Sequence, residues 1–315
     1  MLTETRPSCD TDVWSEWLLH YRQADDEDYG KAVQAAVAEY ADRVIAGAQL
    51  EPGMTLVDVG SGEGLIAFRA IGRIGESLNV ILTDISAPML RYAENAARER
   101  DCVDQCTFIE CPADDLSSIP TASVDVVTTR SVLAYVQDKP AALREFYRIL
   151  KPGGRISIAE PILQDEALYA RVLRMRVEAP SAQPPDRFLE LLHRWKAAQF
   201  PDTEEVCLKS SHVNYTERIL FRNVVDSGFA EGHMELHINS KRAQITSWKQ
   251  FIGCSPHPWA PPLSFILAEK FSAEERQLFE QVLRPSIESG EHISTDRMVY
   301  ITGRKPGFDT KHAAN

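Results

Sequence analysis

The sequence predicts an α/β fold in which a parallel sheet carries helices on both faces. Apolar runs of strand length alternate with segments of helical periodicity from residue 54 to residue 160, and repeated strand–helix units build such sheets. The run at 124–128 is rich in β-branched residues, as expected for a strand buried on both faces. The chain has 315 residues, of which 44% are hydrophobic and 25% charged. These values are typical of a globular protein with a substantial core.

Two helices and a turn precede this alternation. Residues 12–24 and 30–49 place apolar residues at helical spacing, and a Pro-Gly turn follows at 51–53. Ser86 and Pro88 mark a later helix start, because serine caps the first turn and proline there needs no N–H partner. In chain order, the alternation comprises strands at 54–59, 79–84, 106–111, 124–128 and 155–160, with helices at 62–74, from Ser86, and at 140–150.

The second half of the chain has a different pattern. Residues 165–205 are predicted to be helical, with an interruption at three prolines between positions 180 and 185. A helix at 216–228 ends at a glycine C-cap. The remaining predicted elements are strands at 229–238 and 297–304, with a mostly helical segment at 239–296 between them.

Composition and charge exclude several classes of partner. The net charge is −12, whereas nucleic-acid-binding proteins carry a basic stripe, so we expect no nucleic acid. There is no run of 18 apolar residues, and the N-terminus lacks the features of a signal peptide. We therefore expect a cytoplasmic protein that does not bind a membrane, with reduced cysteines. The spacing of Cys102, Cys106 and Cys111 lacks the paired pattern of a metal site, so no metal is expected.

A glycine-rich turn after the first strand is the most informative motif. The run from Val57 to Gly64 reads as a buried strand that turns through three glycines, and Asp84 closes the next apolar run twenty residues later. Glycines let the backbone approach a ligand, and the acid accepts hydrogen bonds from ribose hydroxyls, so the pair predicts an adenosine cofactor. Because residue 65 is leucine, the spacing is G-x-G-x-G. It departs from the G-x-G-x-x-G of nicotinamide-binding proteins and disfavours a nicotinamide dehydrogenase.

Three further motifs follow in order, at 108–116, 123–138 and 143–155. Together with the glycine-rich turn they resemble, over residues 54–161, the class I S-adenosylmethionine (SAM)-dependent methyltransferases, in particular bacterial small-molecule members of type 11/25-like character. The resemblance implies a Rossmann-like, doubly wound sheet of seven strands, the last antiparallel, with helical lid insertions. It also implies SAM as cofactor and S-adenosyl-L-homocysteine as product.

This resemblance suggests how the chain is organised. The acceptor is expected above the strands at 124–128 and 155–160, covered by helical segments. The predicted parts are an N-terminal helical lid at 1–50, a SAM-binding core at 51–161, a helical lid insertion at 162–215, a C-terminal part of the core at 216–306 with the helical insertion 239–296, and a disordered tail at 307–315.

The resemblance also assigns cofactor contacts. The glycine-rich loop would hold the methionine part of SAM, Asp84 the ribose, and Ile85 one face of the adenine. The chain departs from the family where Cys111 and Pro112 replace a usual Gly-Asp, so the acid that meets the adenine amino group is missing or its role moves to Asp114. The implied cofactor-binding residues are Asp58, Gly60, Ser61, Gly62, Gly64, Asp84, Ile85, Ala113, Asp114 and Arg130.

Methyl transfer from a sulfonium is an in-line displacement, so the protein must chiefly align the reactants and exclude water. A base is needed only if the nucleophile carries a proton. Each candidate also has a plain alternative, as an ordinary helix, loop, cap or core residue. The catalytic candidates are Glu160, Tyr135 and His257, and the substrate-binding candidates are Tyr21, Arg22, Arg130, Tyr135, His193 and Trp259.

The sequence therefore predicts a SAM-dependent methyltransferase with a small-molecule acceptor, because large lids and an acidic surface favour an enclosed small substrate. The acceptor could be an amino acid or a secondary metabolite, with an O, N, S or C nucleophile, and the chain a monomer or a homodimer. The alternative is a SAM-binding protein of the same fold that uses SAM for other chemistry or as a structural ligand. A nucleic-acid methyltransferase is disfavoured, because the chain lacks a base-holding motif after the strand at 124–128.

Overall fold

The computed structural model describes residues 11–24, 26–180 and 186–307. The predicted disordered tail falls almost wholly outside these residues. The described chain forms two compact units. Unit 1 takes the residues up to Ala35, together with Leu163–Asn214 and Ile238–Asp296, and unit 2 takes Ala36–Ile162, Tyr215–His237 and the residues from Arg297 onward.

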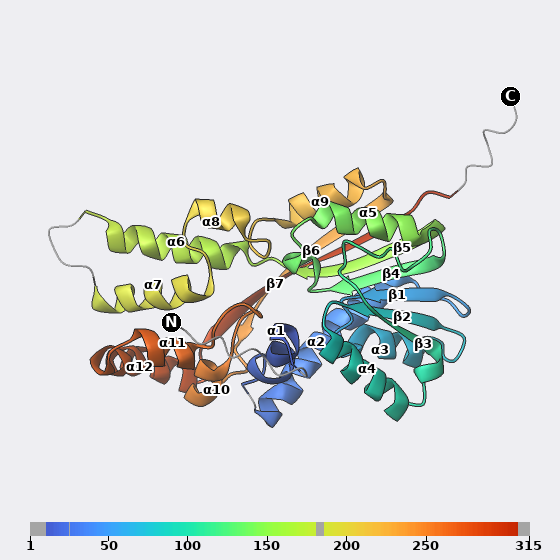
Figure 1. Ribbon diagram of the computed structural model, residues 1–315. Helices are drawn as coiled ribbons and strands as arrows, with labels where there is room; N and C mark the ends of the chain where they lie inside the picture. The colour runs from blue at the N-terminus through green and yellow to red at the C-terminus, as the bar shows by residue number, and fades with distance from the viewer. Residues whose placement is uncertain (1–10, 25, 181–185, 308–315) are drawn as a thin grey trace, which may run out of the picture. The chain divides into compact units, whose positions relative to one another are not determined.

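Unit 2 is built on a seven-stranded sheet with the order β3-β2-β1-β4-β5-β7-β6 (Figure 1). The first five strands run parallel, and β7 pairs antiparallel with β5. The predicted Rossmann-like fold with an antiparallel last strand is confirmed. The strands are β1 Thr55–Val59, β2 Asn79–Asp84, β3 Cys106–Glu110, β4 Val124–Arg130, β5 Leu150–Pro161, β6 Ala230–Arg242 and β7 Ile293–Arg304.

Helices cover both faces of this sheet (Figure 1). Successive strand residues point to opposite faces, so Leu56 is buried on the face of α2, α3 and α4, whereas Val57 is buried on the face of α5 and α9. The part of α2 from residue 36 packs on the sheet, although the lid was predicted to extend to residue 50. The helices are α2 Glu27–Ala48, α3 Leu65–Ile74, α4 Ala87–Glu99, α5 Lys139–Ile149 and α9 Glu217–Asp226.

Local signals placed several boundaries correctly. The bounds of β2 agree with the prediction, and Ser86 caps α4 by accepting a hydrogen bond of 3.2 Å from the Met89 amide. One start was wrong: α3 begins at Leu65 rather than at Gly62. Gly62 and Gly64 have positive φ angles of 53° and 80°, a left-handed conformation that cannot belong to a right-handed helix.

Pairing between strands changed two other predictions. The strand predicted at 155–160 begins earlier, at Leu150 in β5, but the pairing with β4 jumps from Leu150 to Arg155, so residues 151–154 stand outside the regular register. The ends of the predicted helical segment at 239–296 belong to β6 and β7. Asn239 donates a 3.0 Å hydrogen bond to Asp296, which ties the two extensions together.

Unit 1 is helical apart from these strand extensions. The predicted helix at 12–24 is a short α-helix followed by a π-helical turn. A core formed by Leu191, Trp248, Ile266 and Phe279 joins α7, α10, α11 and α12. The helices are α1 Val13–Glu16, η1 Trp17–Tyr21, α6 Gln164–Glu178, α7 Arg187–Gln199, α8 Glu204–Lys209, α10 Trp248–Gly253, α11 Leu263–Lys270 and α12 Ala273–Glu288.

None of the helices in the described ranges combines the length and the apolar character needed to cross a membrane. Five of the six cysteines lie in those ranges, and all five are free thiols.

Candidate cofactor site

The loop after β1 adopts a conformation that requires glycine. Gly60, Gly62 and Gly64 have positive φ angles of 63°, 53° and 80°, which residues with a Cβ rarely adopt. A Cβ at Gly60 would lie 2.3 Å from Cγ2 of Val132, and a Cβ at Gly64 would lie 2.4 Å from Cε2 of Phe68. The loop therefore runs closely past neighbouring side chains, with its backbone as the surface available to a ligand.

This loop is bonded directly to the end of β2. The Ser61 amide donates to the Thr83 carbonyl over 2.9 Å, and the Gly62 amide donates to Oδ2 of Asp84 over 2.8 Å. Oδ1 of Asp84 accepts from the Ser86 amide over 2.9 Å. A carboxylate offers about four acceptor positions, so Asp84 has the capacity to accept hydroxyl donors as well. The structure thus brings together the loop and the acid that the sequence singled out.

One buried polar atom of β1 and one of the loop after it fit a ligand with ammonium and carboxylate groups. Thr128 donates to Oδ1 of Asp58 over 3.1 Å, whereas Oδ2 of Asp58 and Oγ of Ser61 have no hydrogen-bond partner among the described residues. Burial raises the pKa of Asp58 to about 7. Buried polar atoms are normally bonded, so these two are available to the methionine part of SAM.

The predicted adenine side lies beyond β2. Ile85 is 57% exposed, so a broad apolar side chain stands free next to Asp84. The Cys111 amide donates to the Asp84 carbonyl over 3.0 Å, which ties the segment after β3 to the end of β2. Ala113 is buried and Asp114 is exposed. This placement is compatible with the predicted contacts, and the roles of both residues stay predictions.

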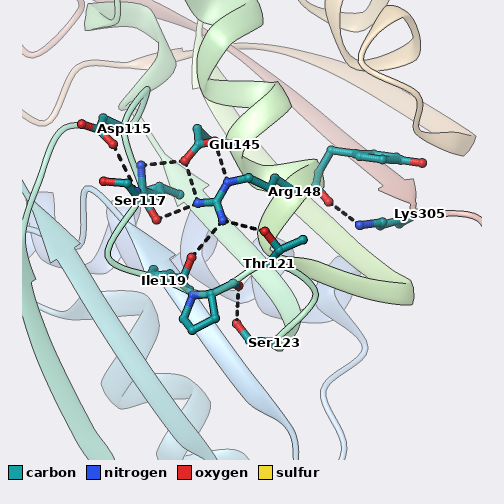
Figure 2. Close-up of polar contacts among 11 residues, drawn as sticks. Asp115, Ser117, Ile119, Thr121, Ser123, Glu145, Arg148 and Lys305 are labelled. Carbon is teal, nitrogen blue, oxygen red and sulfur yellow. Dashed lines mark hydrogen bonds and ion pairs between the residues drawn. The ribbon is translucent and has the colours of Figure 1, made fainter.

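Two side chains of α5, Glu145 and Arg148, bind the backbone of residues 116–119, which follow Asp114 in the chain (Figure 2). The sequence did not indicate this contact. Glu145 accepts from the Leu116 amide over 2.9 Å, and Arg148 donates to the carbonyls of Leu116 and Ile119 over 2.8 Å and 3.0 Å. The two side chains also bond each other, with Arg148 Nε 2.7 Å from Glu145 Oε1. A Glu-x-x-Arg pair on a helix usually faces solvent, so only the tertiary structure reveals this contact.

Glu160 is fully buried at the end of β5. Oε1 accepts from the amides of Val132 and Leu133, and Oε2 accepts from the Ala134 amide, each over 3.0 Å. Burial raises its pKa, and the three amides act against that shift. Both oxygens of this catalytic candidate are therefore bonded to the loop after β4.

The segment after β4 carries two other candidates. Arg130 is the last residue of β4, and its Nη1 lies 3.4 Å from Ser131 Oγ. Tyr135 ends the short 3-10 helix η3, Leu133–Tyr135. Burial raises the pKa of Tyr135, and the negative charge of Glu160 adds to that effect.

Two buried residues next to this segment were missed by the sequence reading. Lys139 is 4% exposed, and its Nζ donates to the Val136 carbonyl over 3.1 Å and lies 4.6 Å from the ring centre of Tyr215. Burial lowers the pKa of Lys139 to about 8, and Glu160 acts in the opposite direction. The Tyr215 hydroxyl donates to the Pro161 carbonyl. A lysine directly after a helix-capping aspartate is normally a surface residue, so no sequence signal predicted that Lys139 would be buried.

Comparison with known proteins decides what this arrangement is. Residues 50–203 match the family model described as a methyltransferase domain. The chain carries a class I SAM-dependent methyltransferase domain. The predictions of that class and of SAM as its cofactor are confirmed.

Relatives of the chain include C-methyltransferases. Over 116 residues the chain is 39% identical to the ubiquinone/menaquinone biosynthesis C-methyltransferase UbiE of Xanthomonas campestris, which covers 37% of this chain and 46% of that protein. The UbiE protein of Vibrio parahaemolyticus is 33% identical over 116 residues, with coverages of 36% and 44%. The chain thus matches less than half the length of these relatives.

Solved structures of other methyltransferases share the fold. A putative methyltransferase from Bacillus halodurans superimposes with a TM-score of 0.51 and 16% identity over 85% of this chain and 99% of that one. A putative sarcosine dimethylglycine methyltransferase from Galdieria sulphuraria gives a TM-score of 0.51 and 14% identity over 93% and 96%. At these identities the likeness concerns the fold alone.

In unit 1, His257 has the surroundings of a core residue. It is 2% exposed, its Nε2 lies 2.7 Å from the Gln199 carbonyl, and its ring centre lies 4.6 Å from that of His212. Burial lowers its pKa. His193 contacts Asp202 through Nε2 over 2.8 Å. The structure gives both histidines structural partners, and a part in binding or catalysis stays a prediction for each.

The other acceptor candidates of unit 1 lie in its N-terminal segment and its proline-rich loop. The Tyr21 carbonyl accepts from the Ser255 amide over 3.0 Å, and the Arg22 carbonyl is the acceptor for Cys254 Sγ at 3.9 Å. Trp259 is 46% exposed and meets Trp14 edge to face, with ring centres 5.9 Å apart. The predicted substrate-binding residues are divided between the units: Arg130 and Tyr135 belong to unit 2, and Tyr21, Arg22, His193 and Trp259 belong to unit 1. The catalytic candidate His257 also belongs to unit 1.

Proposed function

We propose that the protein transfers a methyl group from SAM to a small-molecule acceptor and releases S-adenosylhomocysteine. The observation that carries this proposal is the contact between the two halves of the donor site, the 2.8 Å hydrogen bond from the Gly62 amide to Asp84. It joins a glycine-rich backbone to the Asp84 carboxylate at the carboxyl ends of neighbouring parallel strands, where open α/β sheets bind ligands.

When bound, SAM supplies an electrophilic methyl group on a positively charged sulfur. The chain's part is to hold the donor. Oδ2 of Asp58 would face the ammonium group directly or through water, Ser61 would donate to the carboxylate, and Asp84 would accept from the ribose hydroxyls. Ile85 would pack on the adenine ring. In-line displacement then needs an acceptor held in line and shielded from water.

A small acceptor is supported by the composition and by the relatives. The net charge of −12 disfavours a polyanionic partner such as nucleic acid. The UbiE relatives are named as C-methyltransferases of quinone biosynthesis, so a ring carbon of an electron-rich aromatic compound is the first acceptor to test, with amino acids next. We place this activity in the cytoplasm, in a monomer or homodimer that needs neither nucleic acid nor a membrane.

Calorimetric titration with S-adenosylhomocysteine and with NAD tests donor binding. We expect micromolar binding of S-adenosylhomocysteine alone and its loss in Asp84→Ala. Asp125→Asn is the matched control, since Asp125 also accepts a backbone hydrogen bond, from the Thr55 amide over 2.9 Å, but at the opposite ends of the strands. Preference for NAD, or equal binding by Asp84→Ala, would contradict the proposal.

The alternative function, SAM binding without methyl transfer, is favoured by one observation. Glu160 and His257, two of the three candidate bases, are buried and bonded to backbone groups. Release of S-adenosylhomocysteine with transfer of a labelled methyl group to an acceptor separates the two functions. Tight SAM binding without turnover on any acceptor of the panel would favour the alternative.

A further inference from the structure

We propose that Glu160 is a positioning residue of the donor site. Through its bonds to the backbone of residues 132–134 it sets the place of Val132 against Gly60, and so the shape of the loop that receives the methionine part of SAM. The inference rests on the donor binding proposed above, and it assigns Glu160 a part other than that of a base.

The first observation is the geometry of the carboxylate. Three consecutive amides, those of Val132, Leu133 and Ala134, all donate to it over 3.0 Å. They are the amides at the start of η3, where a short helix leaves its N–H groups without internal partners. Glu160 supplies the acceptors that this segment lacks, from a strand 26 to 28 residues away in the chain.

The second observation is that the loop cannot hold this shape by local preference. Ser131 has a φ angle of 56°, a left-handed conformation that costs free energy for a residue with a side chain. Its amide donates to the Ala159 carbonyl over 2.8 Å. The strained residue itself and the residue after it are thus fixed to the end of β5, at Ala159 and at Glu160.

The third observation links the loop to the donor site. The Val132 amide is held by Glu160, and the Val132 side chain occupies the space beside Gly60, with Cγ2 only 2.3 Å from the place of a Cβ on Gly60. Gly60 begins the sharp turn whose next amides, those of Ser61 and Gly62, bond to the end of β2. A shift of Val132 would therefore alter the packing of the glycine-rich turn.

The surroundings also favour a fixed position for this side chain. Glu160 is fully buried, and burial raises its pKa, whereas the three amides and the positive charge of Lys139 act against that shift. Burying a charge is costly unless it is bonded, and here both oxygens are bonded. This arrangement suits a fixed structural anchor.

The test compares two carboxylates of unit 2 in the full chain. Glu160→Gln keeps the shape but turns one oxygen into an NH2 donor that faces an N–H group. We expect its dissociation constant for S-adenosylhomocysteine, measured by calorimetry, to rise about tenfold, because a buried donor loses its acceptor and the loop shifts. Asp125→Asn should lower the melting temperature as well but leave the dissociation constant unchanged.

Several outcomes would overturn the inference. An unchanged dissociation constant in Glu160→Gln would leave it as a stability residue or, if turnover alone falls, as a base. Val132→Ala is the second test if Glu160→Gln fails to fold, since it keeps the amide bonds but removes the contact with Gly60. We expect a rise of about threefold to tenfold there, and wild-type affinity would contradict the inference. Absence of binding to the wild-type chain would overturn donor binding itself.

Discussion

The side chain of Val132 fills the space beside Gly60, so that a Cβ on this glycine would lie 2.3 Å from Cγ2 of the valine. Gly60 follows β1 and Val132 follows β4, and these two strands are neighbours in the sheet. The contact joins the donor loop to the segment that carries Arg130 and Tyr135.

We expect Gly60→Ala to lower the free energy of unfolding by about 1–3 kcal/mol, because the methyl group clashes with Val132 and the φ angle of 63° is strained for alanine. Binding of S-adenosylhomocysteine should weaken in the same variant. Gly72→Ala is the control: no atom lies within 4 Å of its Cβ position on the exposed side of α3, and it should stabilise by about 0.5–1 kcal/mol. Equal urea midpoints for the two variants would contradict this reading.

Asp58 should make donor binding depend on pH. Burial raises the pKa of Asp58 from 3.8 to about 7. The positive charge of Arg130 opposes this shift, and the negative charge of Asp84 adds to it. A carboxylate attracts an ammonium group only when ionised, so affinity for S-adenosylhomocysteine should increase as the pH rises through 7. In Asp58→Asn the affinity should be lower at pH 8 and should lack this dependence. Calorimetry between pH 5.5 and pH 8.5 checks both points.

The same shift predicts an effect on stability in the absence of ligand. Because the folded pKa lies above the unfolded one, the Asp58 contribution falls as the pH rises from about 4 to 7. Asp58→Asn should therefore be more stable than the wild type at pH 8 by about 4 kcal/mol, since one pKa unit corresponds to about 1.4 kcal/mol, and nearly equal to it at pH 4. A less stable variant at pH 8 would show that the carboxylate is well bonded in the free protein.

Arg148 should stabilise the segment after β3 more than an ordinary surface arginine does. Arg148→Lys keeps the charge but cannot reach the carbonyls of Leu116 and Ile119 together with Glu145 (Figure 2). We expect a loss of about 1–3 kcal/mol in chemical denaturation. Arg98→Lys, which alters an exposed pair with Glu94 on α4, should change stability by about 0–1 kcal/mol.

The Glu145–Arg148 pair also has a pH signature. Arg148 lowers the pKa of Glu145 below 4.5, so the stabilisation is present above that pH and is lost as the pH falls through the lowered pKa. The gap between wild type and Arg148→Lys should therefore shrink in acid. A gap that is constant down to pH 3 would mean that the carbonyl bonds alone carry the effect.

His257 should make unit 1 sensitive to mild acid. Its pKa is lowered from 6.5 by burial, so the unfolded chain takes up a proton below about pH 6.5 before the folded chain does, and stability falls with decreasing pH. All five tryptophans lie in unit 1, so their fluorescence reports its unfolding. His257→Phe should be less stable than the wild type at pH 8 by about 1 kcal/mol, with a smaller gap at pH 5.5. An equal gap at both pH values would mean that His257 is not the sensitive group.

The sequence by itself determined the sheet, the donor loop and the class of cofactor. Each depends on local patterns: alternation of apolar runs, glycines at 60, 62 and 64 that a strand–helix turn requires, and Ser86 as the cap of α4. Such signals lie within a few residues of the structure that they specify, so a single chain displays them. Boundaries failed where pairing between distant strands decided, as in the extensions of β6 and β7.

Only the tertiary structure decided what Glu160, Lys139 and Arg148 contact. In the sequence, Glu160 ends a strand, Lys139 follows a helix cap and Arg148 lies on an amphipathic helix. Such positions fit a catalytic base or a solvated surface residue equally well. Their partners lie far away along the chain. Glu160 binds the amides after β4, Lys139 lies over the ring of Tyr215, and Arg148 binds the carbonyls after β3. Burial and hydrogen bonding between such distant groups set their charge and their part in the site, because these quantities depend on which segments the fold brings together.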